Sequence, residues 1–287
     1  MDKNTLKTGV LLAGLGGLLI VAGQLIAGGR GAFIGFAIGI LITGASYWFS
    51  DKIAVKATGS KPISEQEAPR LYRMVRELAA RADMPMPRLY MSPSAQPNAF
   101  ATGRNEKHAV VAVTQGIMQV LTEEELKGVL AHELSHVRNR DILTTSVAAA
   151  VALGITMVAR MAMWASFLGG GDDDGPNPFA LLLLAILAPV AAGILQMALS
   201  RAREYDADHD GAELLGNGEP LARALEKIDA AARQVPMNVD PSIANAYIVN
   251  PLTGRKVNFA NLFSTHPPTE ERVRRLRAQS GQLGPHS

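Results

Sequence analysis

Four long stretches without a charged residue constrain this chain more than any other feature. They cover residues 8–29, 31–50, 142–159 and 175–200, and they are between 18 and 26 residues long. A helix needs about 20 predominantly apolar residues to cross the hydrocarbon core of a bilayer. Helices of soluble domains seldom run that far without a charge, because one of their faces meets water. The stretches predict about four transmembrane helices, of which the third is the least regular because Arg160 follows it.

Two other interpretations of these stretches have to be weighed. Buried core helices are the alternative for all four. A cleaved signal peptide is the alternative for the first, since Lys3 and Lys7 give it a basic start. Its apolar part exceeds the usual length of about 7–15 residues, however, and a second apolar stretch follows directly after Arg30. We therefore expect an uncleaved pair of membrane helices at the N-terminus.

Lysines and arginines occur on one side of the predicted spans, which indicates the cytoplasmic side. The two loops that would lie outside cover residues 28–32, with one arginine, and 169–178, with no lysine or arginine. The loops and ends on the other side carry the basic residues Lys3, Lys7, Lys52, Lys56, Lys61, Arg138, Arg140, Arg201 and Arg203. The pattern predicts a multi-pass protein of the cytoplasmic (inner) membrane, with both termini and both polar segments in the cytoplasm.

The polar segments have the patterns of a small α/β unit followed by helices. Ser64 and Glu67 form a capping-box pattern before a helix, as do Thr122 and Glu125 before another. Short apolar runs between them predict strands over residues 87–92, 98–103 and 108–114, the last two as a hairpin.

The expected fold class is therefore mainly α with a small β-sheet (α+β), fused to about four transmembrane helices. The predicted parts are an N-terminal membrane hairpin (1–50), a first part of the soluble domain (51–141), a second membrane hairpin (142–200) and a second part of the soluble domain (201–287).

The composition excludes two classes of site. The chain has no cysteine, so any metal must be held by histidine, aspartate or glutamate. The net charge of +2 is too small to indicate a nucleic acid partner. Hydrophobic residues make up 48% of the chain but aromatic residues only 5%, which favours packed helices over a β-sandwich.

The stretch VLAHELSHVRNRDIL, residues 129–143, has the pattern of a metal site. His132 and His136 are four residues apart and share one face of the predicted helix, so both imidazoles can bind one ion. Glu133 lies one step around the helix, where it can reach a water molecule held by that ion. This arrangement supplies two zinc ligands and a general base. A solvent-facing helix with incidental histidines is the alternative interpretation.

A catalytic zinc ion needs a third protein ligand and one open position. The long form of the motif would supply a third histidine, but Asn139 and Ile142 occupy the corresponding positions. Glu204 is the best candidate, because Asp208 follows it on the same helical face and can orient a ligand histidine. We also expect Asn139 beside the ligands. The rival third ligands are His209 and Asp206.

Taken together, these motifs resemble the HtpX-type membrane zinc metalloproteases, which are related more distantly to the CAAX prenyl proteases. The resemblance covers nearly the whole chain and includes PNAFATG, LAHELSHVRNRDI, SRAREYDAD and STHPPTEERVRRL. It implies a gluzincin-like protease domain and one zinc ion per chain on His132, His136 and Glu204, with Glu133 as the base. It also implies proteolytic quality control of membrane proteins, often in a stress response.

Three further site assignments complete the sequence-based hypothesis. His266 is our candidate for stabilising the oxyanion, with Arg272 and Tyr247 behind it. The strand at Asn98, Ala99 and Phe100 is a candidate edge on which an unfolded or membrane-protein polypeptide adds as a further strand, with Arg272 also near the substrate. An ordinary core hairpin, a loop-held histidine and a surface arginine are the corresponding alternatives.

Two other functions remain to be distinguished from an endopeptidase. A catalytically silent membrane scaffold or chaperone that retains the metal site is one, but the presence of Glu133 argues against it. A transporter or channel with Arg160 in its pathway is the other, and the large polar segments argue against it.

Overall fold

The computed structural model describes residues 41, 48–141, 200–234 and 267–283. The chain divides into two compact units, Met1–Tyr47 with Leu143–Ala198 and Trp48–Ile142 with Leu199–Ser287. Apart from Leu41, every described residue belongs to the second unit. The four apolar stretches lie almost entirely outside the described residues, as do Arg160, Tyr247 and His266. None of the described helices combines the length and hydrophobicity that crossing a bilayer requires.

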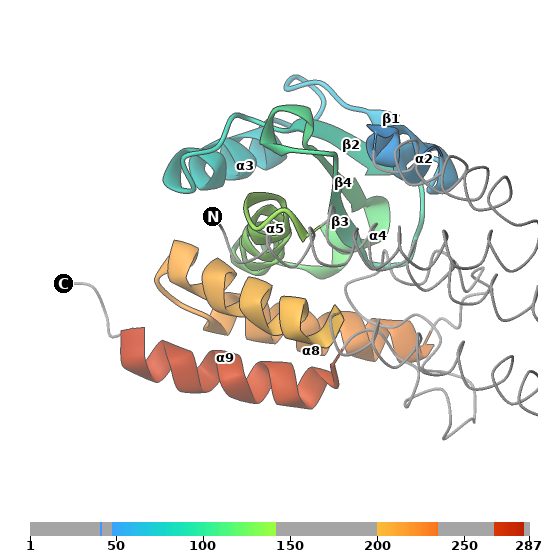
Figure 1. The fold of residues 1–287 in the computed structure, drawn as a ribbon. Coiled ribbons are helices and arrows are strands. Elements are labelled where there is room, and N and C mark those ends of the chain that lie inside the picture. The colour runs from blue at the N-terminus through green and yellow to red at the C-terminus, as the bar shows by residue number, and fades with distance from the viewer. Residues whose placement is uncertain (1–40, 42–47, 142–199, 235–266, 284–287) are drawn as a thin grey trace, which may run out of the picture. The chain divides into compact units, whose positions relative to one another are not determined.

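A small mixed sheet forms one side of the second unit (Figure 1). Its strands are β1 (Lys61–Pro62), β2 (Arg88–Ser92), β3 (Ala99–Thr102) and β4 (Val110–Thr114), in the order β1-β2-β4-β3. β2 and β4 run parallel, whereas β1 pairs with β2 and β3 pairs with β4 in antiparallel fashion. The predicted hairpin is thus confirmed, and β3 lies at an edge of the sheet.

Helices make up most of the rest of the described chain, which confirms a mainly helical fold with a small sheet. Helix α5 lies between the sheet side of the unit and the C-terminal helices, and α9 packs against α8 (Figure 1). The described helices are α2 (Ser50–Ala57), α3 (Pro69–Arg81), α4 (Gln115–Val120), α5 (Glu123–Arg138), a helical segment over residues 200–215, α8 (Glu219–Gln234) and α9 (Thr269–Leu283).

Both predicted capping boxes form their hydrogen bonds, but only one of them starts a helix. Oγ of Thr122 accepts from the N–H of Glu125, whose carboxylate accepts from the N–H of Thr122, and α5 begins at the next residue. Ser64 and Glu67 make the same reciprocal pair, yet α3 begins only at Pro69. A proline disfavours helical backbone at the residue before it and suits the first helical position, so it delays the helix.

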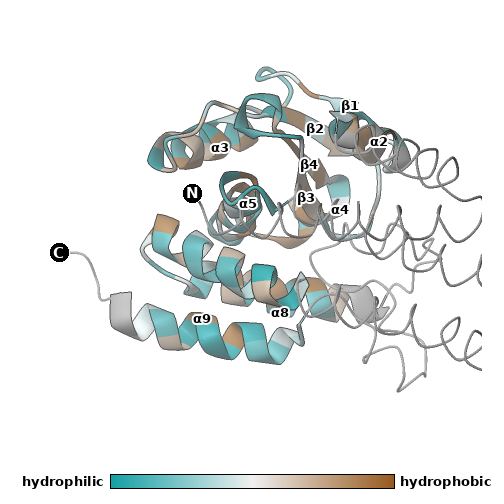
Figure 2. Cartoon of the chain, viewed as in Figure 1, coloured by the Kyte–Doolittle hydropathy of each residue, from teal (hydrophilic) through white to brown (hydrophobic). Residues whose placement is uncertain are grey.

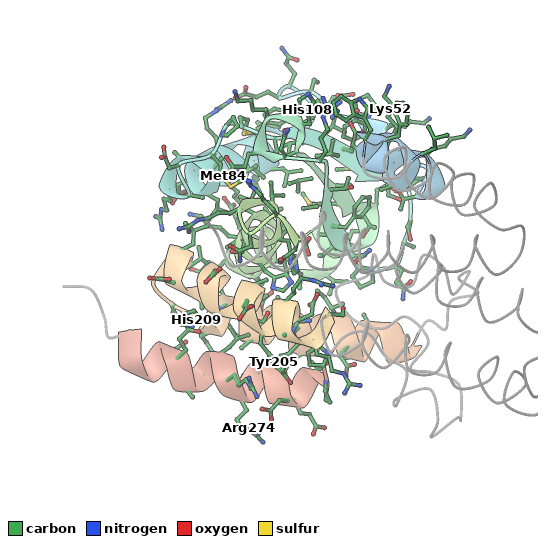
Figure 3. The ribbon with its side chains drawn as sticks, viewed as in Figure 1. Lys52, Met84, His108, Tyr205, His209 and Arg274 are labelled. Atoms are coloured by element: carbon green, nitrogen blue, oxygen red, sulfur yellow. The ribbon has the colours of Figure 1, made fainter. Side chains whose placement is uncertain are left out.

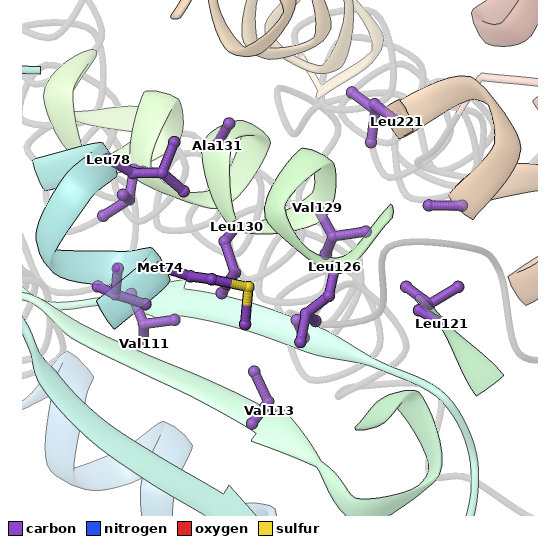
Figure 4. Packing of buried hydrophobic residues seen from close by; sticks show 14 of the residues in the cluster. Met74, Leu78, Val111, Val113, Leu121, Leu126, Val129, Leu130, Ala131 and Leu221 are labelled. Atoms are coloured by element: carbon purple, nitrogen blue, oxygen red, sulfur yellow. The ribbon is translucent and has the colours of Figure 1, made fainter. Parts of the chain in front are cut away.

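Helix α5 is at the centre of the hydrophobic core. Leu126, Val129 and Leu130 on α5 pack near Met74 of α3 and near strand β4, and α8 covers the other side through Leu221 (Figure 4). The strands consist largely of hydrophobic residues, whereas α9 consists mostly of hydrophilic ones (Figure 2). Because α5 is covered from several sides, the polar residues of its histidine motif also lie inside the protein.

Candidate metal centre

Helix α5 places the two motif histidines together, as their spacing predicts. Nε2 of His132 lies 3.1 Å from Nε2 of His136. The two rings meet edge to face, with 4.6 Å between their centroids and 85° between their planes. The side chain of His132 is 1% exposed and that of His136 is 16% exposed. One metal ion could therefore bind a nitrogen of each ring. Solvent reaches the site from the side of His136, which is the more exposed of the two.

The helical segment over residues 200–215 brings Glu204 to these nitrogens. Its Oε1 lies 3.5 Å from Nε2 of His136, and its Oε2 lies 3.6 Å from Nε2 of His132. The rival candidate Asp206 is exposed. His209 is also exposed and groups with Asp210 and Glu213 on the outer side of the segment (Figure 3). Of the three candidates, the structure brings Glu204 to the two histidines.

Gly211 permits the close approach of these two helices. A Cβ at this position would lie 2.9 Å from the backbone nitrogen and 3.1 Å from the Cα of His132. Contacts this short against backbone would force the two segments apart. The glycine therefore lets Glu204, two turns earlier on the same helix, reach across to the histidines.

A buried carboxylate lies beside the second ring nitrogen of each histidine. Oδ1 of Asp208 lies 2.9 Å from Nδ1 of His132, and Oδ2 of Asp141 lies 2.8 Å from Nδ1 of His136. Because an ionised carboxylate only accepts hydrogen bonds, each Nδ1 is assigned the hydrogen and each Nε2 the lone pair. Without a metal ion, burial alone would lower the pKa of His136, but the bonds with Asp141 and Glu204 raise it well above its usual range, so a cation that binds Nε2 would displace a proton from it.

The resulting donor set fits a tetrahedral divalent cation. The two imidazole Nε2 atoms lie 3.1 Å apart, and the carboxylate of Glu204 faces both of them, with one oxygen 3.5 Å from His136 and the other 3.6 Å from His132. A tetrahedral zinc ion with bonds of about 2.0–2.1 Å requires its ligand atoms to lie about 3.3–3.4 Å apart. Two imidazole nitrogens and a carboxylate oxygen, each imidazole fixed by a carboxylate behind it, are also the ligand types that zinc prefers.

Arg272 of α9 holds the carboxylates of the site. Its Nε and Nη2 each donate to one oxygen of Asp208 at 2.8 Å, and its Nη1 lies 3.5 Å from Oε2 of Glu204. Burial alone would raise the pKa of Asp208, but Arg272 and His132 lower it below its ordinary value. Sequence reasoning expected Arg272 near the substrate, whereas the structure places it 1% exposed behind the metal ligands.

Glu133 lies beside the ligands and contacts the edge strand of the sheet. Its side chain is buried, and Oε2 accepts a hydrogen bond of 2.9 Å from the N–H of Ala101 on β3. Burial raises the pKa of this carboxyl group. A raised pKa makes the carboxylate a stronger base than an exposed glutamate.

The residues predicted to bind substrate lie at the start of β3. Asn98, Ala99 and Phe100 are all less than 9% exposed. Asn98 faces β4, because its C=O accepts from the N–H of Thr114 and its N–H donates to Oγ1 of that residue. Alternation along a strand then directs the backbone groups of Ala99 and Ala101 away from β4, toward the side of β3 that no other described strand pairs with.

Two further residues lie beside the metal ligands. The sequence predicted one of them, Asn139, and missed the other, Asp141. Asn139 caps the end of α5 and donates to Asp210 at 2.7 Å, so it joins the two ligand helices. Asp141, which sequence reasoning did not assign to the site, is the partner of His136. Arg140 has a φ of 56°, and this left-handed residue turns the chain back so that Asp141 reaches the helix. An aspartate directly after the motif helix was the available signal.

Comparisons with known proteins agree with this arrangement. The family model described as Peptidase family M48 matches residues 65–280. A "Protease HtpX homolog" of Pelotomaculum thermopropionicum is 52% identical over 281 residues, covering 96% of this chain and 99% of the relative. One from Pyrococcus furiosus is 47% identical, covering 97% of this chain and 96% of the relative.

A solved structure shares the fold. The crystal structure of S. mikatae Ste24p superimposes with a TM-score of 0.56 and is 20% identical. The match covers 84% of this chain and 58% of the Ste24p chain. Together with the His132–His136–Glu204 cluster, the family match and the near full-length relatives show that the chain belongs to peptidase family M48 and is a metalloprotease of the HtpX type.

Proposed function

We propose that this chain is an integral-membrane zinc endopeptidase that cuts unfolded or damaged membrane proteins, in membrane protein quality control. The observation that carries the proposal is the convergence of His132, His136 and Glu204 around one point, with Glu133 beside it. The four apolar stretches and the similarity to HtpX proteases support the membrane part of the proposal.

Different residues of the site would bind the metal ion and transfer the proton. His132, His136 and Glu204 would hold one zinc ion, which supplies a water of lowered pKa and polarises the substrate carbonyl. Glu133, with its raised pKa, takes the proton from the attacking water and later delivers it to the leaving amine. The Ala101 N–H holds one oxygen of Glu133 and so orients the other.

The edge of β3 that no other described strand pairs with is the proposed docking place for the substrate. The outward backbone groups of Ala99 and the C=O of Ala101 suit pairing with an extended polypeptide, since the N–H of Ala101 already donates to Glu133. Asn98 and Phe100 hold the strand in place from its other side. Binding through backbone hydrogen bonds depends little on the substrate's sequence. This suits a protease that acts on many unfolded segments.

Two residues take supporting roles in the proposal. Arg272 is assigned to holding Asp208 and Glu204 instead of the substrate, since it is buried behind both. His266, which lies outside the described residues, stays the candidate for stabilising the oxyanion.

The arrangement in the membrane is proposed from the sequence. Residues 1–50 and 142–200 would form two membrane hairpins, and residues 51–141 and 201–287 would form the protease domain on the cytoplasmic side. Reporter enzymes fused after Gly171 and after Ser287 should report opposite sides of the inner membrane. Reports from the same side would exclude this topology.

The activity is tested by comparing the parent protein with Glu133→Gln, both purified in detergent. We expect one zinc ion per chain in both proteins, and casein cleavage that is lower by about 10²–10⁴-fold in the variant. Equal cleavage by both proteins would remove Glu133 as the base. Zinc binding without cleavage in either protein would instead favour the silent scaffold.

A further inference from the structure

A group of aromatic and basic side chains lies on the outer side of α2, apart from the metal centre. We call it the aromatic–basic face, and it consists of Trp48, Phe49, Lys52, Lys56 and Arg104. The two aromatic residues are the most exposed large hydrophobic residues of the described part of this unit, at 56% and 46% exposure. A tryptophan and a phenylalanine exposed side by side indicate a contact with something other than water.

The face is held in a fixed orientation because the opposite side of α2 is docked on the sheet. Asp51, on that opposite side, is buried and accepts a hydrogen bond of 2.7 Å from Arg88 of β2. At the end of the helix, the C=O of Thr58 accepts from Ser92, at the other end of β2, at 2.9 Å. Lys52 and Lys56, one turn apart, are both exposed, and Figure 3 shows Lys52 on the outer side of α2.

Cations and aromatic rings alternate within the face. Nζ of Lys52 lies 5.4 Å from the ring centre of Phe49. The guanidinium of Arg104 lies 4.4 Å from the ring centre of Trp48. Such pairs place an aromatic ring and a positive charge next to each other, so one partner can contact both. The partner that matches both properties is an anionic phospholipid surface, where tryptophan lies at headgroup level and lysines attract the phosphates.

The sequence supports a lipid partner over a protein partner. The uncharged stretch of residues 31–50 has Trp48 and Phe49 near its end, and the first lysine, Lys52, comes three residues after Phe49. An apolar span, then aromatic residues, then lysines is the order expected at the cytoplasmic surface of a bilayer. We therefore propose that the aromatic–basic face rests on anionic phospholipid headgroups. This inference depends on the proposed membrane function.

The position of Arg104 gives the contact a consequence for catalysis. Arg104 follows the last residue of β3, Thr102, by two positions, and stacks on Trp48. The lipid contact would thus hold the end of the substrate-binding edge strand at the membrane surface. A segment of a membrane protein that unfolds at this surface would then be close to the edge strand β3.

The two tryptophans of the chain provide a direct test. The full-length Trp164→Phe protein, whose remaining tryptophan is Trp48, is reconstituted into phosphatidylcholine vesicles with or without phosphatidylglycerol. We expect brominated lipids to quench Trp48 emission, aqueous iodide to quench it weakly, and phosphatidylglycerol to strengthen the bromine effect. Adding Lys52→Gln and Lys56→Gln should abolish the effect of phosphatidylglycerol.

A matched control removes the same charge elsewhere. Arg70 and Arg73 are exposed on α3, and Arg70→Gln with Arg73→Gln should leave Trp48 quenching unchanged. If Trp164→Phe does not fold, Lys56→Cys offers a second probe, because the natural chain has no cysteine. A spin label there should be reached by oxygen more than by a water-soluble nickel complex.

The outcomes separate this inference from the proposed function. A chain that does not float with vesicles contradicts the proposed membrane protease itself. A chain that floats and cleaves casein, but whose Trp48 is quenched by iodide and not by brominated lipid, overturns only the lipid contact. Protection of Trp48 from both quenchers would show that a protein segment covers the face, which also overturns it.

Discussion

Nδ1 of His132 lies 2.9 Å from Oδ1 of Asp208, a residue of the same helix as Glu204. One helix therefore supplies both a candidate metal ligand and the carboxylate that orients another ligand. We expect Asp208→Asn to weaken metal binding by about 10–100-fold, since the imidazole loses its charged partner. Competition with a chelating dye measures this affinity. Asp206→Asn, on the exposed side of the same segment, should bind as the parent does.

Arg272 should matter for stability as well as for metal binding. Replacing it with methionine leaves the carboxylates of Asp208 and Glu204 buried without their cation, which costs about 3–5 kcal/mol for a buried pair. The thermal midpoint followed by circular dichroism should fall accordingly. Arg274→Gln removes an exposed arginine from the same helix, and its midpoint should stay near that of the parent. Equal midpoints for both variants would contradict the assigned role.

Gly211→Ala tests the close approach of the two ligand helices. The added Cβ would meet the backbone of His132 at 2.9 Å, so the helices must separate. We expect a loss of about 1–3 kcal/mol in stability and weaker metal binding, because Glu204 moves away from the histidines. Gly281→Ala adds the same methyl group in α9 where nothing lies within 4 Å. That control should be neutral or slightly stabilising.

Glu125 should make stability depend on pH in the acid range. Burial alone would raise its pKa, but bonds from Lys227 and Thr122 lower it below the ordinary value. Its contribution is therefore complete above the unfolded-state pKa of about 4.3 and is lost as the pH falls through the folded-state value. With a chelator present throughout, Glu125→Gln should show a smaller drop in thermal midpoint between pH 7 and pH 4. Glu124→Gln, at an 80% exposed side chain, should follow the parent.

Sequence reasoning predicted those features of the fold that are formed by residues close together in the chain. His132 and His136 share a helical turn, and the capping box of Thr122 and Glu125 spans four residues. The late start of α3 at Pro69 was also readable from the proline rule, although the capping pattern suggested an earlier start.

The contacts that sequence reasoning missed join distant segments. Asp141 reaches His136 only because Arg140 adopts a left-handed conformation, which no residue-type preference indicates for arginine. Arg272 of α9 meets Asp208 of the helical segment over residues 200–215 across a sequence separation of 64 residues. Such contacts follow from tertiary packing, so an arginine that looks like a surface residue in the sequence can be the most buried cation of the site.

The ligand set also makes the metal centre a cross-link of the fold. His136 and Glu204 are separated by about 70 residues, and joining the ends of a loop of that length stabilises a folded chain by roughly 4 kcal/mol through the entropy of the unfolded state. In a chain without cysteine, a bound ion would do what a disulfide does in secreted proteins. Metal removal should therefore weaken the association of the two parts of the protease domain, residues 51–141 and 201–287. If the chain were cut between residues 142 and 199, the bound ion would still join the two parts.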